Sequence, residues 1–475
     1  MKLSQLIAVD KDVEITGIAV DSRKVRKGNL FLCVCGEHSD GHDFAKEALK
    51  NGAAMIVTEH ALGFKHEIVL PDTRRAAASL FATWYQNPQK NLRIYGVTGT
   101  NGKSSVVGIL HHIYQKAGIK SAICGTLGLG WDGKFYSTEN TTPLPEVLYE
   151  KLREMVDDGI THLFMEVSSH ALALDRVSEI EFSYGVLTNL TPEHLDFHKT
   201  MDNYAATKEK LFLQSQKKIF NLDDPFGYLT HQKHLPSAIG YGKNNRCEFM
   251  LDEIRHHDSD GTVFTVRHRN ETYLFTTSLV GEYNLYNLLA AIAVALSDGI
   301  DGETVAHAIA EFSGIKGRLE CVYRDKFTVF IDYAHTPDAL MRVLAELRKT
   351  SPKRLRVVFG CGGDRDSSKR PVMGRIAQTI ADDVIVTSDN SRSEDPQKII
   401  ADILAGMEKS SLDRVTVIED RKAALRWAIE TAESKDVILV AGKGHEEYEI
   451  NASGKHPFSE TDMICQALKQ FGFLK

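Results

Sequence analysis

The stretch from Arg93 to Ser105, R-I-Y-G-V-T-G-T-N-G-K-S-S, constrains the fold of this chain more than any other. Its apolar start is typical of a buried strand, Thr98–Gly102 is a turn of glycine and small polar residues, and the apolar spacing from Ser104 onward is helical. Such a junction binds phosphate, because backbone N–H groups and the positive helix end face the anion, the lysine neutralises charge and the serine can hold Mg²⁺. Val97 stands where the P-loop pattern has its first glycine, so the alternative is an ordinary turn with a surface lysine. The predicted cradle consists of Gly99, Thr100, Asn101, Gly102, Lys103, Ser104 and Ser105.

Length and composition limit the possible classes of protein. At 475 residues the chain has room for about three domains. The net charge of -7 argues against nucleic acid as a partner, because binding to a phosphate backbone requires a basic surface. The seven cysteines are scattered without a C-x-x-C pair, so neither a disulfide framework nor a zinc cage is indicated. The N-terminus lacks the apolar core of a signal peptide and no apolar run reaches the roughly 18 residues of a membrane helix, so we expect a cytoplasmic protein without a membrane segment.

The order of predicted elements divides the chain into three regions. Up to the polar linker Gln86–Asn91 the elements are short and mixed. The second region holds the phosphate cradle, buried strands that open into polar loops, and a long apolar helix, Leu285–Leu296. In the third, strands and helices alternate regularly, which indicates a parallel sheet of βαβ units. We predict an α/β fold with a central P-loop-type mononucleotide-binding domain and a C-terminal Rossmann-like parallel-sheet domain. The expected domains are 1–90, 91–313 and 314–475.

Side chains able to bind a metal follow the strand ends of the second region. Glu166 ends a buried strand, His194 lies in the loop after the next strand, and Lys208 lies on the helix beyond. Doubly wound sheets bind ligands at such strand ends, and a carboxylate and an imidazole there can ligate Mg²⁺ beside nucleotide phosphates. Taken singly, each has an alternative, as a surface carboxylate, a loop histidine or a solvated lysine. Their common position after the cradle favours metal binding for Glu166 and His194. The same loops also carry His170, Asp196 and His198.

Four polar loops follow strands of the third region and are expected to form a binding rim on one edge of its sheet. They begin at Asp332, Gly360, Asp389 and Gly442. Arg392 can clamp a carboxylate in a bidentate pair, while Glu394 and Glu446 can meet an ammonium group. The rim therefore suits a zwitterionic ligand such as an amino acid. The alternative for Gly360–Asp364 is a lone glycine-rich turn.

Together these motifs resemble the Mur ligase family, over nearly the whole chain. The resemblance rests on D-S-R at Asp21–Arg23, T-G-T-N-G-K-S at Thr98–Ser104, N-T-T-P at Asn140–Pro143, E-V-S-S-H-A-L at Glu166–Leu172, H-L-D-F-H at His194–His198, Y-x-x-x-K at Tyr204–Lys208, G-x-x-N-x-x-N at Gly281–Asn287, G-R-x-E at Gly317–Glu320 and D-Y-A-H-T-P-D at Asp332–Asp338. The set is most similar to the members that join the third residue of the peptidoglycan stem peptide to UDP-MurNAc-L-Ala-D-Glu.

The resemblance implies an activity, cofactors and roles for single residues. ATP phosphorylates the D-glutamyl carboxylate and the amine of a diamino acid displaces phosphate, with domains for the UDP-sugar, ATP and the amino acid. The implied catalytic residues are Lys103, Lys208, His194 and Glu166, and the implied Mg²⁺ ligands are Ser104, Glu166, His194 and a carbamylated Lys208. Asn284, Arg318 and Asp332 are expected at the nucleotide. Ser22, Asn140, Thr141, Thr142, Ser168 and Arg176 are expected at the UDP-sugar peptide, and Asp389, Asn390, Arg392, Gly442 and Glu446 at the incoming amino acid.

Departures from the family pattern leave the choice of amino acid open. Ser104-Ser105 replaces the commoner Thr-Thr and keeps the hydroxyl, whereas Leu174 removes an expected substrate hydrogen bond. Asp389-Asn390-Ser391-Arg392 stands where D-N-P-R is usual in members that add meso-diaminopimelate, so the rigid proline is missing. We favour meso-diaminopimelate, with L-lysine or another diamino acid as the alternative. Other hypotheses are a nucleotide-dependent switch without ligase chemistry, a neighbouring Mur enzyme and folylpolyglutamate synthase. A monomer is expected.

Overall fold

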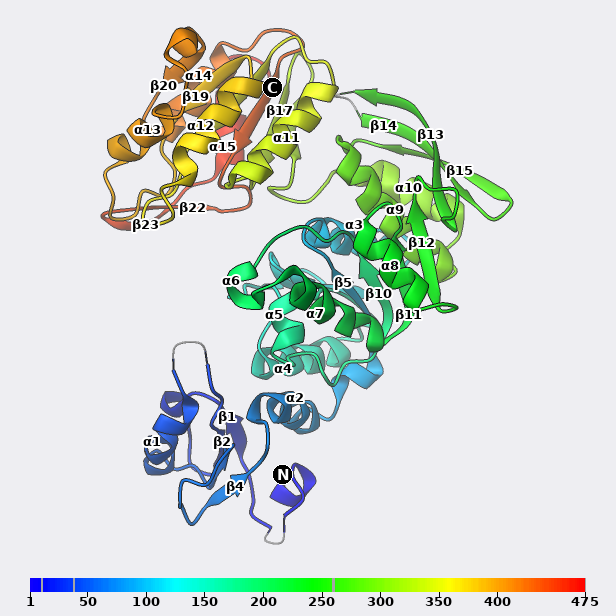
Figure 1. Ribbon diagram of the computed structural model, residues 1–475, viewed down its shortest axis with the longest axis vertical. Helices are drawn as coiled ribbons and strands as arrows, with labels where there is room; N and C mark the ends of the chain where they lie inside the picture. Colours follow the sequence, from blue (N-terminus) through cyan, green and yellow to red (C-terminus); the bar gives the residue numbers. More distant parts are fainter. Residues whose placement is uncertain (10–11, 37–38, 259–260, 475) are drawn as a thin grey trace. The chain divides into compact units, whose positions relative to one another are not determined.

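The computed structural model describes residues 1–9, 12–36, 39–258 and 261–474, which form two compact units. Unit 1 comprises Met1–Met250 and Leu289–Thr304, and unit 2 comprises Leu251–Leu288 and Val305–Lys475. Three main sheets follow one another along the chain, and helices cover them (Figure 1). The predicted α/β class is therefore confirmed, whereas the exact domain boundaries stay a prediction.

The first sheet of unit 1 has four parallel strands in sequence order, β1 (Gly17–Ala19), β2 (Asn29–Leu32), β3 (Met55–Thr58) and β4 (Glu67–Val69). Helix α1 (Ala45–Lys50) lies between β2 and β3 in the chain, and α2 (Thr73–Trp84) follows β4. Asp72 caps α2 by accepting a hydrogen bond from the Arg75 N–H, which explains why this helix begins where it does. Within the expected linker, Pro88–Asn91 forms a short 3₁₀ turn, η4. A proline suits the first position of such a turn, because the backbone N–H at that position has no partner within the turn.

The central sheet of unit 1 places the strand that precedes the cradle between two parallel neighbours. Its order across unit 1 is β12-β11-β10-β5-β9-β6-β7-β8, and β13 (Phe249–Asp258) begins beside β12. The strands are β5 (Arg93–Thr98), β6 (Ser121–Gly125), β7 (Gly128–Trp131), β8 (Lys134–Tyr136), β9 (His162–Glu166), β10 (Phe182–Leu187), β11 (Ser215–Asn221) and β12 (Ala238–Gly242). Because β5 pairs in parallel with both β9 and β10, the loops after all three strands open at the same edge.

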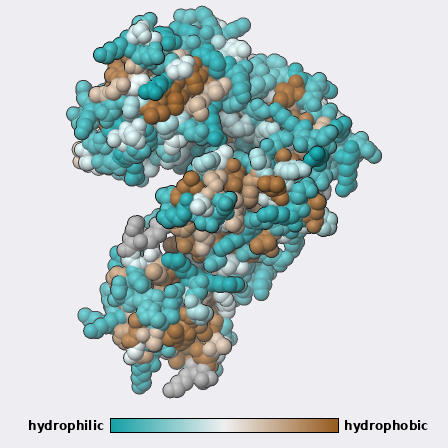
Figure 2. Space-filling view, viewed as in Figure 1, coloured by the Kyte–Doolittle hydropathy of each residue, from teal (hydrophilic) through white to brown (hydrophobic). Residues whose placement is uncertain are grey.

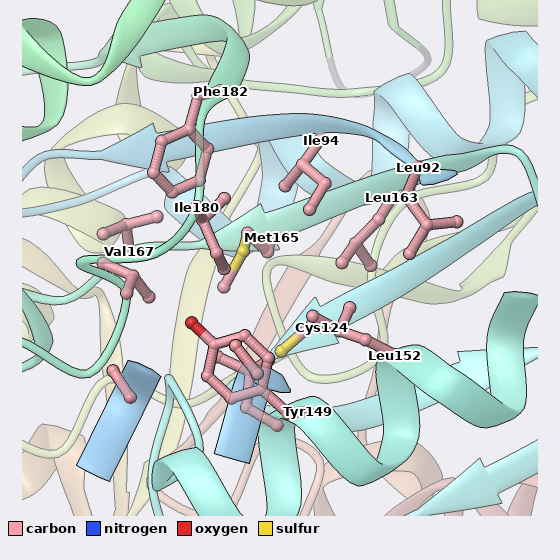
Figure 3. Close-up of a cluster of buried hydrophobic side chains, with 14 of the residues drawn as sticks. Leu92, Ile94, Cys124, Tyr149, Leu152, Leu163, Met165, Val167, Ile180 and Phe182 are labelled. Atoms are coloured by element: carbon pink, nitrogen blue, oxygen red, sulfur yellow. The ribbon is translucent and has the colours of Figure 1, made fainter. Parts of the chain in front are cut away.

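Alternating side chains of these strands build a core on each face of the sheet. On one face Ile94 and Met165 point toward Tyr149 of α4 (Pro145–Asp157), as Figure 3 shows. On the other, the rings of Tyr95 and Phe164 pack against Tyr114 of α3. The remaining helices of this region are α3 (Lys103–Lys116), α5 (Ser169–Ala173), α6 (Leu195–His198), α7 (Met201–Leu213) and α8 (Pro225–Lys233). The strand that precedes the cradle is therefore held by packing on both faces of the sheet.

A buried carboxylate ties the end of helix α9 (Glu282–Ser297) to the strand below the cradle. Asp298 directly follows α9 and its side chain is 6% exposed. It accepts hydrogen bonds from the Tyr95 hydroxyl at 2.5 Å and the Tyr114 hydroxyl at 2.6 Å, and pairs with Arg93. Three donors to one carboxylate satisfy its buried oxygens and fix β5 and α3 against the helix end.

Unit 2 contains a doubly wound sheet of order β16-β17-β21-β18-β19-β20. The inner strands are parallel, and β16 runs antiparallel at one edge. One face packs on α11, α12 and α13 and the other on α14 and α15. The elements are β14 (Gly261–His268), β15 (Glu271–Thr277), α10 (Gly302–Glu311), β16 (Glu320–Arg324), β17 (Thr328–Asp332), α11 (Pro337–Lys349), β18 (Leu355–Phe359), α12 (Lys369–Ile380), β19 (Asp383–Val386), α13 (Pro396–Leu404), β20 (Val415–Val417), α14 (Arg421–Glu430), β21 (Val437–Ala441), β22 (Tyr448–Asn451), β23 (Gly454–Pro457) and α15 (Glu460–Gln470).

The predicted alternation of strands and helices in the third region is present. Strand β10 ends at Leu187, because the residues beyond it turn to contact the cradle loop. On the face drawn in Figure 2 hydrophilic side chains predominate. Among the described residues, no helix combines the length and the apolar character that crossing a membrane requires.

The Asp298 contacts predict a stability effect. Replacing Asp298→Asn keeps the shape but loses the charge that three donors share, so we expect the free energy of unfolding to fall by about 2 kcal/mol. Urea denaturation measures this change. The matched control is Asp157→Asn, whose side chain is 65% exposed and pairs with Arg153, and which should change stability by less than about 1 kcal/mol. Equal effects of the two substitutions would contradict the assignment of Asp298 as an anchor.

Candidate active site

The cradle loop lies against the loop that follows β10. The Thr100 N–H donates to the Asn189 carbonyl at 3.0 Å, and the Asn101 N–H donates to Asn189 Oδ1 at 3.0 Å. Gly99 has φ +146°, and a Cβ there would stand 1.9 Å from Thr188 Oγ1. Gly102, with φ +85°, directly precedes α3, whose first turn carries Lys103, Ser104 and Ser105. Glycine is therefore required at position 99 by the close approach of the two loops.

Two lysine side chains meet at one carbonyl of this loop. Lys103 Nζ donates to the Gly99 and Thr100 carbonyls, each at 2.9 Å. Lys208 Nζ, from the middle of α7, also donates to the Gly99 carbonyl at 2.9 Å. The structure therefore brings together two lysines that are far apart in the sequence, on the side of the sheet where β5 ends.

Lys208 is held in an environment that disfavours its charge. Its side chain is 1% exposed and its ammonium lies 4.6 Å from the centre of the Tyr204 ring. Burial, reinforced by the positive charge of Lys103, lowers the pKa of Lys208 well below its usual value, against the opposing effect of Glu193. A lowered pKa makes the neutral amine more available, and the neutral amine is the form that reacts with electrophiles such as CO₂.

Glu166 is fixed by hydrogen bonds next to the helix that carries Ser104. It is 2% exposed and ends β9. Its Oε1 accepts from Ser104 Oγ at 2.8 Å and from the Thr126 N–H at 2.9 Å, and its Oε2 accepts from Thr126 Oγ1 at 3.1 Å. A carboxylate and a hydroxyl thus form a pair of oxygen ligands beside the phosphate cradle.

His194 lies in a cluster of aromatic rings after β10. Its backbone is left-handed, with φ +55°, and its side chain is 45% exposed. Its ring contacts His170 edge-on, with the ring centres 4.8 Å apart, and Tyr204 at 6.5 Å. Tyr204 in turn packs on Lys208, so His194 reaches the lysine site through one intervening ring. His198 is buried and its Nε2 forms a hydrogen bond with Ser169 Oγ at 2.9 Å, which indicates a structural role.

Four residues expected at the UDP-sugar peptide belong to a hydrogen-bonded chain that starts at Glu166. Thr142 Oγ1 donates to the Glu166 carbonyl at 2.8 Å and accepts from the Ser168 N–H at 3.0 Å. Arg176 Nη1 donates to the Thr142 carbonyl at 2.9 Å, and Thr141 Oγ1 bonds Thr126 Oγ1 at 3.1 Å. Asn140 lies in the same loop and Ser22 in the N-terminal region, where Ser22 Oγ donates to Glu47.

Three residues expected at the nucleotide, Asp332, Arg318 and Asn284, belong to unit 2. The Asp332 carboxylate accepts from the Leu319 N–H at 2.7 Å and the Ala334 N–H at 2.8 Å, and burial raises its pKa. Arg318 stacks over the Tyr333 ring at 5.1 Å. Asn284 is buried at the start of α9 and donates to the Val280 carbonyl at 2.8 Å. Asp332 thus fixes the turn that carries Arg318.

The residues of the expected rim lie at strand ends of unit 2, and their role toward an amino acid stays a prediction. Asn390 Nδ2 donates to Glu446 Oε2 at 2.8 Å, and Arg392 Nη1 donates to the Gly363 carbonyl at 2.7 Å. Glu394 does not offer a free carboxylate, because Arg370 holds both its oxygens and lowers its pKa to about 2. Gly442 has φ +121°, and a Cβ there would stand 2.6 Å from Asp389 Oδ2, so this glycine makes room for Asp389.

Several residues of the site were not identified from the sequence. Thr126 binds Glu166 and Asn189 binds the cradle, but neither stands in a pattern that marks it. Arg370 is 1% exposed and holds Glu394 from α12. Lys443 is fully buried and donates to Asn390 Oδ1 at 2.8 Å; its position within G-K-G-H-E was the available signal.

The donor set fits Mg²⁺ at a nucleotide. Among the described residues, no group of three or more histidine, cysteine and carboxylate side chains is placed to hold a metal ion. Mg²⁺ does not require one, since it keeps several waters and binds one or two protein carboxylates together with substrate phosphates. Ser104 Oγ and Glu166 Oε1, 2.8 Å apart beside the cradle, match that requirement.

Comparison with known proteins gives the family. The Mur ligase family catalytic domain matches residues 14–80, the Mur ligase middle domain 97–295, and the Mur ligase glutamate ligase domain 317–444. The UDP-N-acetylmuramoyl-L-alanyl-D-glutamate--2,6-diaminopimelate ligase of Syntrophomonas wolfei is 42% identical and covers 96% of this chain and 95% of its own; that of Geobacillus kaustophilus is 40% identical, with 97% and 96% covered. The chain belongs to the Mur ligase family, which confirms the resemblance.

Solved structures agree with this family. A structure of a UDP-N-acetylmuramoyl-L-alanyl-D-glutamate--2,6-diaminopimelate ligase has a TM-score of 0.75 and 30% identity, with 99% of both chains covered. The MurF ligase of Thermotoga maritima in complex with ADP has a TM-score of 0.61 at 17% identity, with 97% of this chain and 99% of the other covered. The second likeness supports the fold alone.

The environment of Lys208 predicts that this residue lowers stability. Lys208→Met removes a buried ammonium close to Lys103, so we expect the free energy of unfolding to rise by about 1 kcal/mol in bicarbonate-free buffer. Because the folded state has the lower pKa, the unfolded state binds more protons, and the gain should be largest at the lowest pH tested and shrink as the pH rises toward ~10.

Thermal and urea unfolding at several pH values measure the difference. Lys210→Met is the matched control on the same helix, because Lys210 is only partly buried and donates to the Leu172 carbonyl at 3.3 Å. A Lys208→Met variant that is less stable than the wild type at all pH values would contradict the assignment.

Proposed function

We propose that this chain is the ATP-dependent ligase that adds meso-diaminopimelate to the D-glutamate of UDP-MurNAc-L-Ala-D-Glu, the MurE step of peptidoglycan precursor synthesis. The relatives that carry this activity in their names are about 40% identical over nearly the full length. That likeness favours this reaction over those of MurF of Acinetobacter baumannii and folylpolyglutamate synthase of Mycobacterium tuberculosis, whose solved structures are 19% and 17% identical to this chain. The domain assignment in this proposal is 1–90 for the UDP-sugar, 91–313 for ATP and 314–475 for the amino acid.

One observation carries the proposal. Two lysine side chains converge on the Gly99 carbonyl, and a Ser104–Glu166 pair of oxygen ligands lies beside the start of α3, which carries Lys103. The backbone N–H groups at the start of α3 and the positive charge of Lys103 would meet the phosphates of a bound nucleotide. This combination is suited to a nucleoside triphosphate.

The chain's own residues then supply positioning and charge. The cradle N–H groups and Lys103 bind the phosphates and stabilise negative charge that develops when the γ-phosphoryl group moves to the D-glutamyl carboxylate. The amine of the incoming amino acid displaces phosphate from the acyl phosphate and forms the amide bond. Thr142, Ser168 and Arg176 are proposed to orient the carboxylate for this transfer, because all three belong to the hydrogen-bonded chain from Glu166.

Mg²⁺ is proposed to be held by Ser104, Glu166 and His194 together with a carbamylated Lys208. When bound, the ion neutralises charge on the phosphates. The amine of Lys208 fits carbamylation because its pKa is lowered and because the product is an anion beside Lys103, which replaces repulsion by attraction. Glu166 and Ser104 are already oriented by Thr126 and by the helix start.

For the amino acid, we propose recognition by Asn390, Arg392 and Glu446 on the rim of unit 2. Arg392 would leave the Gly363 carbonyl to bind a carboxylate, and Glu446 would accept from an ammonium group. Ser391 is buried between them in the position of the usual proline. L-Lysine stays the alternative to meso-diaminopimelate. We further propose a cytoplasmic monomer, in keeping with seven free cysteines.

A turnover assay tests the proposed function. Phosphate release should require ATP, UDP-MurNAc-L-Ala-D-Glu and an amino acid together, and should be fastest with meso-diaminopimelate in a panel with L-lysine, L-ornithine and lanthionine. Glu166→Gln should lower kcat by about a hundredfold or more, because it removes a charge beside the transferring group. ATP hydrolysis that ignores both other substrates would instead indicate a nucleotide-dependent switch.

Carbamylation of Lys208 has its own measurement. With ¹³C-bicarbonate present, the wild type should show a ¹³C NMR signal of a carbamate that is absent from Lys208→Met. Lys210→Met is the control that should keep the signal. A spectrum without a carbamate signal in the presence of bicarbonate and Mg²⁺ would contradict the carbamylation of Lys208. The ligase assignment would then still be tested by the turnover assay.

A further inference from the structure

A fully buried lysine stands behind the rim residues of unit 2 and touches one of them. Lys443, just after β21, has 0% exposure. Its Nζ donates to Asn390 Oδ1 at 2.8 Å and to the Tyr448 carbonyl at 3.1 Å, and it lies 3.6 Å from Asp389 Oδ1. Two of the three ammonium protons are used in these hydrogen bonds, and the side chain has no exposed surface, so Lys443 does not itself bind the amino acid.

These contacts decide which way the Asn390 amide faces. Its oxygen receives the Lys443 ammonium and, at 2.9 Å, the Ile450 N–H. Only an oxygen can accept from two donors, so the Asn390 NH₂ group must point the other way, where it donates to Glu446 Oε2 at 2.8 Å. Asn390 therefore presents a donor, and Glu446 an acceptor whose orientation depends on that donor.

The cation behind Asn390 is itself fixed by buried charges. Arg421, with 0% side-chain exposure, donates Nε to Glu460 Oε1 at 2.7 Å and Nη2 to the Ala441 carbonyl at 2.8 Å. Although burial acts in the opposite direction, Arg421 and Lys443 together keep the pKa of Asp389 below its usual value. The Asp389 carboxylate stays negative beside Lys443 and keeps the ammonium group in place.

We propose that Lys443 is a specificity-determining positioning residue: it locks the Asn390 amide so that Asn390 and Glu446 together present one donor and one acceptor to the zwitterionic end of the incoming amino acid. This inference rests on the proposed function and adds to it a residue that touches no substrate. Without Lys443 the amide oxygen keeps only the Ile450 N–H, so the amide is held less firmly. A rotated amide would turn its oxygen toward Glu446, where two acceptors repel each other.

The test is a double-mutant cycle on Lys443 and Asn390 in the full chain. Phosphate release is measured with saturating ATP and UDP-MurNAc-L-Ala-D-Glu while meso-diaminopimelate is varied, and then with each of the other two substrates varied. Lys443→Met should raise KM for meso-diaminopimelate about tenfold, with kcat within about threefold and the other two KM values unchanged. In an Asn390→Ala background the same substitution should add less than about twofold, because Lys443 acts through Asn390.

Two further variants keep the test decisive. Lys443→Gln retains one donor for Asn390 and loses the charge, so it should raise the same KM by about threefold; this variant replaces Lys443→Met in the cycle if the latter does not fold. Lys422→Met, at an exposed position of α14, is the matched lysine control and should change nothing. An unchanged KM for meso-diaminopimelate, an equal rise of all three KM values, or a full effect in the Asn390→Ala background would each overturn the proposal.

Turnover by the wild type distinguishes a failure of this inference from a failure of the proposed function. If the wild type releases no phosphate with any amino acid, the ligase assignment is contradicted and the inference with it. If the wild type turns over and the Lys443 variants keep its KM for meso-diaminopimelate, the inference alone is wrong.

Discussion

The Gly99 carbonyl accepts hydrogen bonds from Lys103 and from Lys208, and the rest of the proposed site depends on that shared contact. It is possible only because Gly99 lacks a side chain, since a Cβ would collide with Thr188. The sheet order supplies the other condition, because β5 lies between β9 and β10 and the loops after all three strands open at one edge. Two lysine side chains are thereby fixed beside the loop on which a bound polyphosphate would lie.

A related arrangement is found in both units: contacts within the protein hold a buried ionisable side chain next to the proposed ligand site. In unit 1 Thr126 and Ser104 hold Glu166, and the aromatic ring of Tyr204 covers Lys208. In unit 2 Lys443 holds Asn390. Burying such groups costs stability unless every donor and acceptor is paired, and here the pairing also selects one orientation. Rigidity of this kind favours catalysis and specificity, because the ligand meets groups that do not need to reorganise.

Much of the fold and part of the site could be predicted from the sequence. The strand, glycine turn and helix start of the cradle follow from residues that are adjacent in the sequence, and so does the alternation of strands and helices in the third region. Both could therefore be predicted. A place for Lys208 near the cradle was expected only through the family resemblance, and its contact with Gly99 was not predicted, because it joins residues more than a hundred positions apart. The pairing of Glu394 with Arg370 and of Asn390 with Lys443 could not be predicted, since either acid or amide could equally have faced solvent. The Asp298 anchor was missed for the same reason: no motif marks a carboxylate that follows an apolar helix.

The most direct measurement is the anomalous diffraction of crystals grown with Mn²⁺ and a non-hydrolysable ATP analogue. Our account predicts one peak at ligand distance, about 2.1 Å, from Ser104 Oγ and Glu166, with the analogue's phosphates on the N–H groups of the loop after β5 and within reach of Lys103. A nucleotide bound elsewhere, or a metal peak that touches neither Ser104 nor Glu166, would contradict it.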